Sequence, residues 1–304
     1  MGAMYADINC LKFPYKKGLL PNQEIVGDVY EVVPGGSALN FARVCAGLDL
    51  HPVFVGKIGK DKIGALLKEL LLETGITPSL IEDPKASTMV GMNFIGEDES
   101  SIMTVVGSAS RSFIGKQMMD KIEPYLDKVG YLYIGGCFKL KALLPFYPAL
   151  ARKARRKNVK VILDHGRITN LVSKVDIQTI KKILPFVDHY LPNKEEFLAV
   201  WGGNSVDEAV AKVRKISASD IVVKDAEKGA TGFRKNKSIQ LPSFKVAVLN
   251  TVGAGDSFNA GFIKAQSLGS DFVESIRFGS ATAALKISDS SLPTLKKIEK
   301  LLKK

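Results

Sequence analysis

The sequence lacks a long hydrophobic run: no stretch approaches the ~18 consecutive apolar residues of a membrane-spanning helix. Its first residues also lack a basic region followed by an apolar stretch, so we expect a cytoplasmic protein with no membrane partner. Cysteine is scarce, with widely spaced residues at Cys10, Cys45 and Cys137. An odd number of distant cysteines is typical of reduced thiols and argues against a disulfide framework or a cysteine-based metal site.

Internal repeats, low-complexity tracts and Pro/Gly-rich linkers are also missing, so nothing in the sequence divides the chain into separate units. Its 304 residues, of which 46% are hydrophobic, suffice for a sizeable core, and large α/β domains reach this length. We therefore expect one domain over residues 1–304.

Negative charge is in short supply: 43 Lys and Arg face 31 Asp and Glu, which gives a net charge of +12. Such a surplus suits either an acidic ligand, such as a nucleotide or nucleic acid, or a lysine-rich solvated surface. The basic residues are spread along the chain, and their densest groups, Arg152–Lys157 and the C-terminal tail, contain no interleaved aromatic residues. The pattern favours a solvated surface, and we expect no nucleic-acid partner.

From about residue 115 the sequence alternates between helical patterns and short apolar runs. This alternation predicts an α/β fold with a doubly wound, mostly parallel sheet flanked by helices, which binds ligands at the carboxyl ends of its strands. The predicted strands are Val129–Ile134, Val159–Leu163, His189–Leu191 and Ile221–Val223. The predicted helices are Gly115–Leu126, Leu140–Arg156, Ile177–Leu184, Val206–Ile216, Asp256–Leu268, Phe272–Ile287 and Thr294–Leu302.

The amino-terminal third does not follow this alternation. Its β-rich stretches predict a separate small β-sheet, which we expect to form a lid over the site from roughly residues 9–34 and 86–108. The stretches are Glu24–Val33, Thr88–Ile95 and Ile102–Val106, and between them lie a helix that begins near Ser37 and a short strand at Val53–Ile58.

One segment, Asn250–Phe262, is the most informative for function. Gly253, Ala254 and Gly255 form a turn almost without side chains before an apolar helical run, so their backbone N–H groups can point at a bound anion. The following helix adds its positive N-terminal end to this anion site. Asp256, at the rim, is a poor ligand for an anion and is suited to take a proton from an attacking hydroxyl. The alternative for the turn alone is an ordinary strand-to-helix connection with Asp as N-cap.

A second glycine turn lies at Pro34–Arg43, where two glycines end a β-rich stretch. Ser37 can cap the helix that follows, and Asn40, one turn further, offers a donor and an acceptor that suit vicinal hydroxyls. The alternative is a strand-to-helix turn with a polar residue on its exposed face, and the residues alone favour neither.

Two polar segments follow predicted strands in the second half of the chain. Asn193 and Glu196 match a helix capping box, which is the stronger interpretation on their own. If they share a crevice with Gly253–Asp256, Asn193 could contact phosphate and Glu196 could orient a water on a magnesium ion. Lys224, which ends the next strand, could reach a nucleotide phosphate, or it is a solvated lysine in a turn.

In this order and spacing, these segments resemble the ribokinase-like family of sugar and nucleoside kinases, the phosphofructokinase-B type. The resemblance covers essentially the whole chain and is strongest in two distant signatures, Gly35–Gly64 and Thr251–Phe262. It implies a doubly wound α/β domain with a small β-sheet lid. It also implies ATP as the phosphoryl donor and Mg²⁺ as a cofactor.

The resemblance implies a role for each matching residue. Asp256 would be the base that deprotonates the acceptor hydroxyl, and the amides of Gly253–Gly255 would hold the transferring phosphoryl group. Substrate hydroxyls would be bound by Asp7, Gly36 and Asn40.

On the nucleotide side, Asn193 and Glu196 would serve the phosphate and magnesium site, with Glu196 acting on the ion through water. Lys224 and Gly229 would lie beside the nucleotide, and the helix that contains Ala283 would border the adenine pocket. Because lids of this family often pair between subunits, the resemblance also implies a homodimer.

The chain departs from the family pattern, and from ribokinase itself, at several positions. Asn250 stands where members usually have an Asp linked to a monovalent-cation site, and the tail Ser288–Leu292 lacks the usual glycine, so potassium activation is in doubt. Ribokinase itself has Asn in place of Tyr5 and Lys in place of Ser37. We therefore do not expect a standard ribokinase.

The predicted lid stretch 86–110 contains no Lys or Arg, which argues against a phosphorylated or carboxylated acceptor. We therefore expect an ATP-dependent kinase for a primary hydroxyl of a small neutral sugar. A nucleoside kinase of the adenosine type is the alternative, because apolar lid residues could pack on a base. Those residues equally suit ordinary core packing; they are Met89, Met92, Phe94 and Met103.

The alternative from another class is a catalytically silent regulator that binds a nucleotide or nucleic acid, suggested by the positive net charge. The intact Gly-Ala-Gly-Asp turn argues against it, because a silent protein has no need of Asp256. A dehydrogenase is disfavoured, since no G-x-G-x-x-G motif follows a first strand with an acidic residue ~20 further on.

Overall fold

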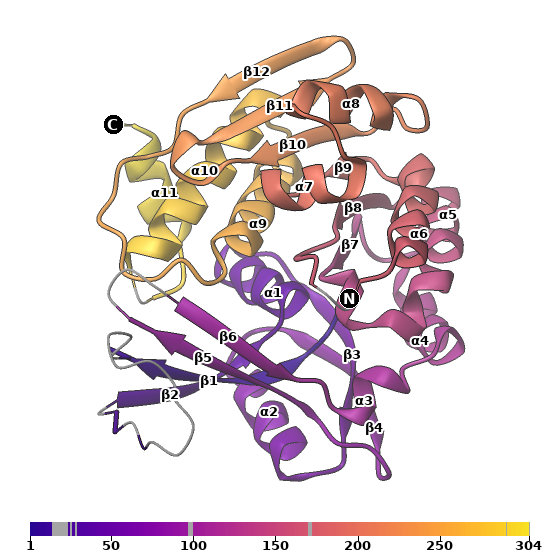
Figure 1. The fold of residues 1–304 in the computed structure, drawn as a ribbon, viewed down its shortest axis with the longest axis vertical. Helices are drawn as coiled ribbons and strands as arrows, with labels where there is room; N and C mark the ends of the chain where they lie inside the picture. The colour runs from indigo at the N-terminus through magenta and orange to yellow at the C-terminus, as the bar shows by residue number, and fades with distance from the viewer. Residues whose placement is uncertain are drawn as a thin grey trace.

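The computed structural model describes residues 1–13, 24, 26–27, 29–96, 100–169, 172–289 and 291–303. Its largest sheet has six strands in the order β12-β11-β10-β9-β8-β7 (Figure 1). The neighbours from β7 to β10 are parallel, and β10, β11 and β12 form antiparallel pairs. These strands are β7 (Tyr131–Gly135), β8 (Lys160–Asp164), β9 (His189–Tyr190), β10 (Asp220–Lys224), β11 (Ala230–Arg234) and β12 (Lys237–Leu241).

Helices connect the parallel strands, as a doubly wound sheet requires. They are α5 (Tyr147–Arg156) after β7, α6 (Lys174–Ile183) after β8, and α7 (Lys194–Trp201) and α8 (Val206–Arg214) after β9. The predicted α/β fold is thereby confirmed. One predicted helix, Leu140–Arg156, is divided: Pro145 lies in a 3₁₀ stretch, Lys141–Phe146, and the α-helix begins only at Tyr147.

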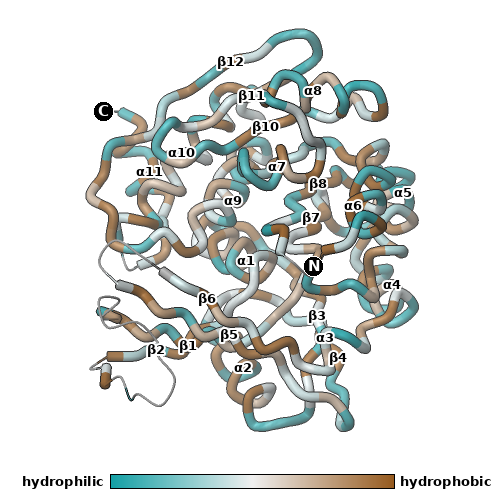
Figure 2. The backbone as a smooth tube through the Cα atoms, viewed as in Figure 1, coloured by the Kyte–Doolittle hydropathy of each residue, from teal (hydrophilic) through white to brown (hydrophobic). Residues whose placement is uncertain are grey.

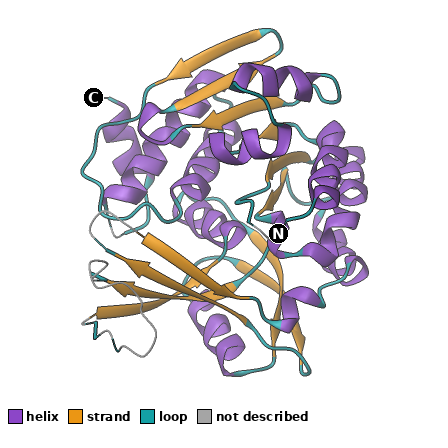
Figure 3. Ribbon diagram, in the orientation of Figure 1, coloured by secondary structure: helices purple, strands orange, loops and turns teal. Residues whose placement is uncertain are grey.

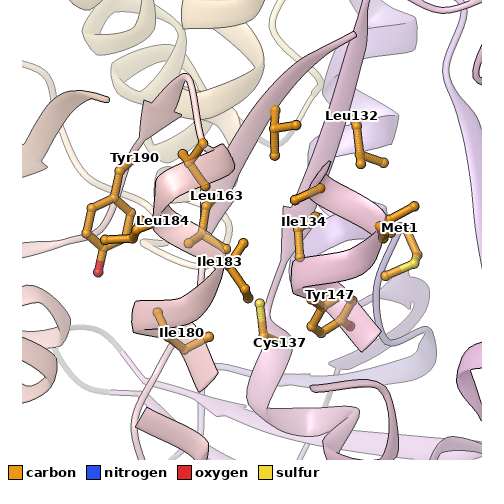
Figure 4. Packing of buried hydrophobic residues seen from close by; sticks show 14 of the residues in the cluster. Met1, Leu132, Ile134, Cys137, Tyr147, Leu163, Ile180, Ile183, Leu184 and Tyr190 are labelled. Carbon is orange, nitrogen blue, oxygen red and sulfur yellow. The ribbon is translucent and has the colours of Figure 1, made fainter. Parts of the chain in front are cut away.

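The sheet is buried on both faces, which is why its strands read as continuous apolar runs. Val161 and Leu163 of β8 pack in a cluster with Ile180 of α6, and Figure 4 shows this cluster around Leu163, Ile180 and Ile183. Ile162, between them in sequence, belongs to a second cluster on the opposite face. On the outside, α5 turns basic residues to solvent, and Figure 2 shows the hydrophilic residues along it.

The second cluster is covered by helices from both ends of the chain. α1 (Ser37–Gly47) and α9 (Ala254–Ser267) contribute Leu39 and Phe262 to it, and α10 (Phe272–Ser288) lies beside α9 (Figure 1). The remaining helices are α2 (Lys62–Leu72), α3 (Ser108–Arg111), α4 (Gly115–Ile122) and α11 (Leu295–Leu302). Within the described ranges, no helix is long and apolar enough to cross a membrane.

A separate four-stranded sheet, in the order β2-β1-β5-β6, lies apart from the helix-rich part (Figure 3). Its strands are β1 (Tyr5–Leu11), β2 (Val29–Gly35), β5 (Met89–Ile95) and β6 (Ser100–Val105). The predicted small sheet is thus confirmed as part of the fold, with β1 as an unpredicted inner strand. Parts of the predicted lid ranges, residues 14–23, 25, 28 and 97–99, lie outside the described residues, as does residue 290 of the C-terminal tail.

The predicted strand at Val53–Ile58 is also present, as β3 (Val53–Gly59). It pairs in parallel with β4 (Thr77–Asp83) and forms a two-stranded sheet with it instead of joining the six-stranded one. Between them runs α2, whose N-cap is Asp61; the Asp61 carboxylate accepts a hydrogen bond of 2.7 Å from the Gly64 amide.

Candidate active site

The glycine turn before α9 has the geometry of an anion site. Gly253 is the N-cap of α9 with φ +79°, a left-handed conformation that favours glycine, and no side chain caps the helix. Among the hydrogen bonds of the described residues, none engages the amides of Gly253 or Gly255, whereas the Ala254 amide donates to Thr251 O at 3.2 Å. Asp256 is therefore not the N-cap, and the helix end presents free N–H groups.

Asp256 is held by two side chains of α1. Ser37 Oγ donates a hydrogen bond of 2.6 Å to Asp256 Oδ1, and Asn40 Nδ2 donates one of 3.3 Å to Oδ2. The two predicted turns thus meet in space. Burial raises the pKa of Asp256 to about 7, against the pull of the Ser37 hydrogen bond. A carboxyl group that titrates near neutrality is suited to general-base chemistry.

The predicted cap at Ser37 is wrong. Gly36 is the N-cap of α1, without a side-chain cap bond, and Ser37 is the first helical residue. Its hydroxyl instead donates to the Asp256 carboxylate, which the fold brings close. A hydrogen bond to a carboxylate is stronger than one with a backbone amide. Gly36 has φ +111°, and a Cβ there would lie 2.3 Å from Ala3 O, so the turn has room for glycine alone.

Asp7 lies on β1 between two neighbouring strands, each of which has a glycine opposite its carboxylate. A Cβ on Gly35 would lie 2.0 Å from Asp7 Oδ2, and one on Gly91 would lie 2.2 Å from Oδ1. Burial raises the pKa of Asp7 to about 6. Its buried Oδ1 has no hydrogen-bond partner of good geometry within the described part of the chain, although the nearby Asn93 amide lowers the pKa of Asp7.

Lys139 reaches the same region from the 3₁₀ turn after β7, and the sequence reasoning missed it. Its Nζ donates to the hydroxyls of Tyr5 and Thr104, at 3.2 Å each, and lies 4.6 Å from the centre of the Tyr5 ring. Burial lowers the pKa of Lys139, while the charge of Asp7 raises it. The available signal was a lysine shortly after a predicted strand, at the sheet edge where ligands bind.

Lys224 is not a solvated lysine, since its ammonium is mostly buried in a polar network under the glycine turn. It forms an ion pair of 2.9 Å with Asp164 and donates to Asn259 Oδ1 at 3.1 Å. Asn259 in turn donates to Asp164 Oδ2 at 2.6 Å and to the Tyr133 hydroxyl at 3.1 Å. A Cβ on Gly255 would lie 3.4 Å from Lys224 Nζ, so this charge lies close to the open amides.

Asp164 was also missed by the sequence reasoning, although it is the last residue of β8 and thus a polar residue at a carboxyl strand end. Burial opposes its ionisation, but the ammonium of Lys224 holds the pKa of Asp164 below its usual range. The pair therefore stays charged, which fixes a positive and a negative group below the turn.

Asn193 and Glu196 form the capping box of α7, as their spacing predicts. Asn193 Oδ1 accepts from the Glu196 amide at 2.8 Å, and Glu196 Oε2 accepts from the Asn193 amide at 3.4 Å. The two also lie near the network of Lys224: Asn193 forms a β-bridge with Lys224, and burial together with the charge of Asp164 raises the pKa of Glu196 to about 7.

The described residues contain no group of three or more His, Cys, Asp or Glu side chains arranged to hold a metal ion. A magnesium ion here would need oxygen ligands from a bound nucleotide and from water, the usual arrangement for this ion at phosphate sites. Glu196 is half-buried near Lys224 and Asp164, and its carboxylate oxygens suit such water-mediated contact.

The last two predicted residues lie further from Asp256. Gly229 precedes β11 with φ +89°, and a Cβ there would lie 2.0 Å from Leu241 O, so the hairpin itself requires glycine. Ala283 is half-buried on α10. Among the described residues, no hydrogen bond or ion pair joins either to the network of Lys224, and their nucleotide role stays a prediction.

Comparison with known proteins places this geometry in context. Residues 5–297 match the model of the pfkB family carbohydrate kinases. A ribokinase of Haemophilus influenzae is 28% identical over 97% of this chain and 94% of its own, and a 5-dehydro-2-deoxygluconokinase of Bacillus licheniformis is 26% identical over 88% and 86%. The structure of Arabidopsis thaliana ribokinase complexed with ribose and ATP superposes with a TM-score of 0.81, at 26% identity, over 100% of this chain and 97% of that one.

Proposed function

Because the chain belongs to the pfkB family of carbohydrate kinases, we propose that it transfers a phosphoryl group from ATP to a primary hydroxyl of a small neutral sugar, with Asp256 as the base. Its class as a phosphotransferase with an alcohol acceptor follows from the family. One observation carries the assignment of the site: Asp256 lies between the polar side chains of α1 and the open amides that begin α9.

In the proposed reaction, the acceptor hydroxyl replaces Ser37 or Asn40 as a donor to Asp256. Its proton passes to the carboxylate as its oxygen forms a bond to the γ-phosphorus, and the bond from that phosphorus to the β–γ bridging oxygen breaks. ADP leaves with that oxygen. A base with a pKa near 7 is ionised often enough to act and basic enough to hold the proton.

The donor side is built to meet the charge on the transferring group. The amides of Gly253 and Gly255 and the positive end of α9 would face the phosphoryl oxygens, and Lys224, paired with Asp164, lies close to Gly255. Asn193 and Glu196 lie beside Lys224 and would hold the phosphates and the water around magnesium. Magnesium, when bound, neutralises charge on the phosphate oxygens.

On the acceptor side, Asp7 offers a buried oxygen without a partner, and Gly36 and Asn40 line the turn beside Asp256. The four-stranded sheet that carries Asp7 would act as the lid and exclude water, which otherwise competes as acceptor. Strands of this sheet also expose apolar side chains, which supports a homodimer through the lid; they are Val29, Tyr30, Ile102, Met103 and Val105.

A second acceptor class, a sugar acid, is favoured by Lys139. The neutral-sugar prediction considered only cations within the lid, and this ammonium reaches Thr104 of the lid from outside it. Relatives named 5-dehydro-2-deoxygluconokinases act, by that name, on a gluconate derivative. On the other hand, Asp7 lies close enough to Lys139 to raise the pKa of that lysine, so part of its charge is offset, which supports the neutral sugar.

The nucleoside alternative has less support. Met89 is fully buried in the core cluster, whereas Met103 is about half-exposed at 48% of its surface, so these lid residues do not form one apolar platform for a base.

The test is an ADP-release assay with ATP and magnesium against free sugars, sugar acids and nucleosides, run alongside Asp256→Asn. Turnover with one acceptor class, lost in the variant, supports the proposal. No acceptor-dependent release with any class, together with tight binding to duplex DNA, would instead favour the silent regulator.

A further inference from the structure

Lys286 is a half-buried lysine whose ammonium has no counter-charge in contact. It lies in the last turn of α10 and, within the part of the chain that the structure describes, no hydrogen bond or ion pair engages its Nζ. The helix C-terminus favours a cation there. Burial nevertheless lowers the pKa of Lys286, and the charge of Arg43 lowers it further, whereas the charges of Glu31 and Asp289 raise it. An unpaired cation held away from water is costly, so its position calls for a reason.

The position of Lys286 is beside the glycine turn. The point at which a Cβ on Gly253 would lie is 3.9 Å from Lys286 Cε and 3.8 Å from Asn40 Nδ2. The segment that leads into the turn is hydrogen-bonded to the residue after this lysine: the amides of Leu249 and Asn250 both donate to Ile287 O, at 2.7 and 3.3 Å.

Two lysines therefore flank the open amides. Lys224 lies close to Gly255 and is neutralised by its ion pair with Asp164, whereas Lys286 lies beside Gly253 without a partner. Of the two, Lys286 is the one whose charge is not cancelled by a contact, and it adds to the positive potential where the phosphoryl group would bind.

With Lys286 in place, this part of the fold does not fit a bound monovalent cation. Such a cation needs several free oxygens. Asn250 carries no charge, and its Oδ1 already accepts a hydrogen bond of 2.8 Å from the Val252 amide. Ile287 O already accepts two amides. The ammonium of Lys286 would also repel a second cation brought into this part of the fold.

We propose that Lys286 is an internal substitute for a monovalent cation: it positions the glycine turn and supplies the positive charge, so that the kinase needs no potassium. This rests on the proposed kinase function. Lys286 is a positioning residue, since it acts on the phosphoryl group through the turn and touches no reacting atom.

The test compares the wild type with Lys286→Met, which keeps the stem and removes the charge, and with Lys286→Arg, which keeps the charge. Lys296→Met, an exposed lysine on α11, removes the same net charge away from the turn and is the matched control. ADP release is measured at constant ionic strength while tetramethylammonium chloride is replaced by potassium chloride.

We expect the wild type and Lys296→Met to be insensitive to potassium. Lys286→Met should lose about 10- to 100-fold in kcat without potassium and recover part of it when potassium or ammonium is added, whereas Lys286→Arg should keep most of its rate. A merely structural lysine would not produce rescue by a cation. Activation of the wild type by potassium, or an unimpaired Lys286→Met, would overturn the proposal.

A second readout does not require turnover. Melting temperature is measured with potassium against tetramethylammonium, and only Lys286→Met should be stabilised selectively by potassium. Potassium-selective stabilisation of the wild type, or none in Lys286→Met, overturns the proposal; Lys286→Gln replaces Lys286→Met if the latter does not fold. A wild type without any kinase activity contradicts the proposed function, and the melting comparison still decides the role of Lys286.

Discussion

Replacing Asp256 by Asn should stabilise the protein while it removes activity. Burial raises the pKa of Asp256 from 3.8 to about 7, so above pH 7 the ionised carboxylate lowers the free energy of unfolding. A shift of about 3 units corresponds to about 4 kcal/mol, an upper bound at that pH. Ser37 can still donate to Asn Oδ1, but Asn40 must turn its amide, which costs part of the gain. We expect a net stabilisation of about 2 kcal/mol.

This stabilisation should depend on pH in a definite direction. The folded-state pKa is raised, so the folded chain binds the proton more tightly than the unfolded one, and Asp256 favours folding at low pH. That contribution declines as pH rises from about 4 to about 7 and is absent above. The difference between Asp256→Asn and the wild type should therefore be largest near pH 8 and small near pH 5.

Urea unfolding of both proteins at the two pH values measures this difference, and ADP release measures the activity. Turnover should fall by about 10²- to 10⁴-fold, the usual contribution of a positioned base, while ATP binding stays nearly unchanged. A wild type more stable than Asp256→Asn near pH 8, or a difference that does not vary with pH, would refute the account of a desolvated carboxylate. Near wild-type turnover in the variant would refute its role as base.

Three further outcomes are expected. In the wild type, kcat/KM should decline below about pH 7, approaching tenfold per unit, because Asp256 becomes protonated; a profile flat down to pH 5 would contradict this. Gly91→Ala should raise the acceptor KM at least about tenfold without changing the KM for ATP, because its Cβ displaces Asp7, whereas Gly27→Ala, which has open space, should have no effect. Lys139→Met should raise the KM of a sugar acid about 10- to 100-fold but that of a neutral sugar little, so equal effects on both would remove Lys139 from acceptor recognition.

The parts of the fold that the sequence predicted are those encoded locally. The alternation of helices and apolar runs after residue 115 reflects burial of both sheet faces, so strands such as β8 can be read directly. β1 was missed because its buried residues include Asp7 and Asn9, which interrupt the apolar pattern of a strand. The strands beside β1 make these polar residues tolerable, because Asn93 donates to Asn9 and the glycines of β2 and β5 leave space for Asp7. No pattern within β1 itself indicates these contacts.

The candidate site follows the same division. The turn from Gly253 to Asp256 can be recognised from the sequence, since its glycines and its carboxylate are contiguous. Lys139 and Asp164 do not, because each is a single polar residue at a strand end, and its meaning depends on which strands lie side by side. The hydroxyl of Ser37 was assigned to the nearest amide, whereas the fold supplies it with a carboxylate from the other end of the chain.

The hydrogen bond between Ser37 and Asp256 joins residues 219 positions apart. On a ribosome that adds about 5 to 20 residues per second, the carboxylate is made roughly 10 to 40 s after the hydroxyl that holds it. By the end of that interval the nascent chain contains β1, α1 and the six strands from β7 to β12, but not yet the proposed base. A chain in synthesis that binds ATP would therefore lack the proposed base, and the proposed site is complete only when α9 docks against α1.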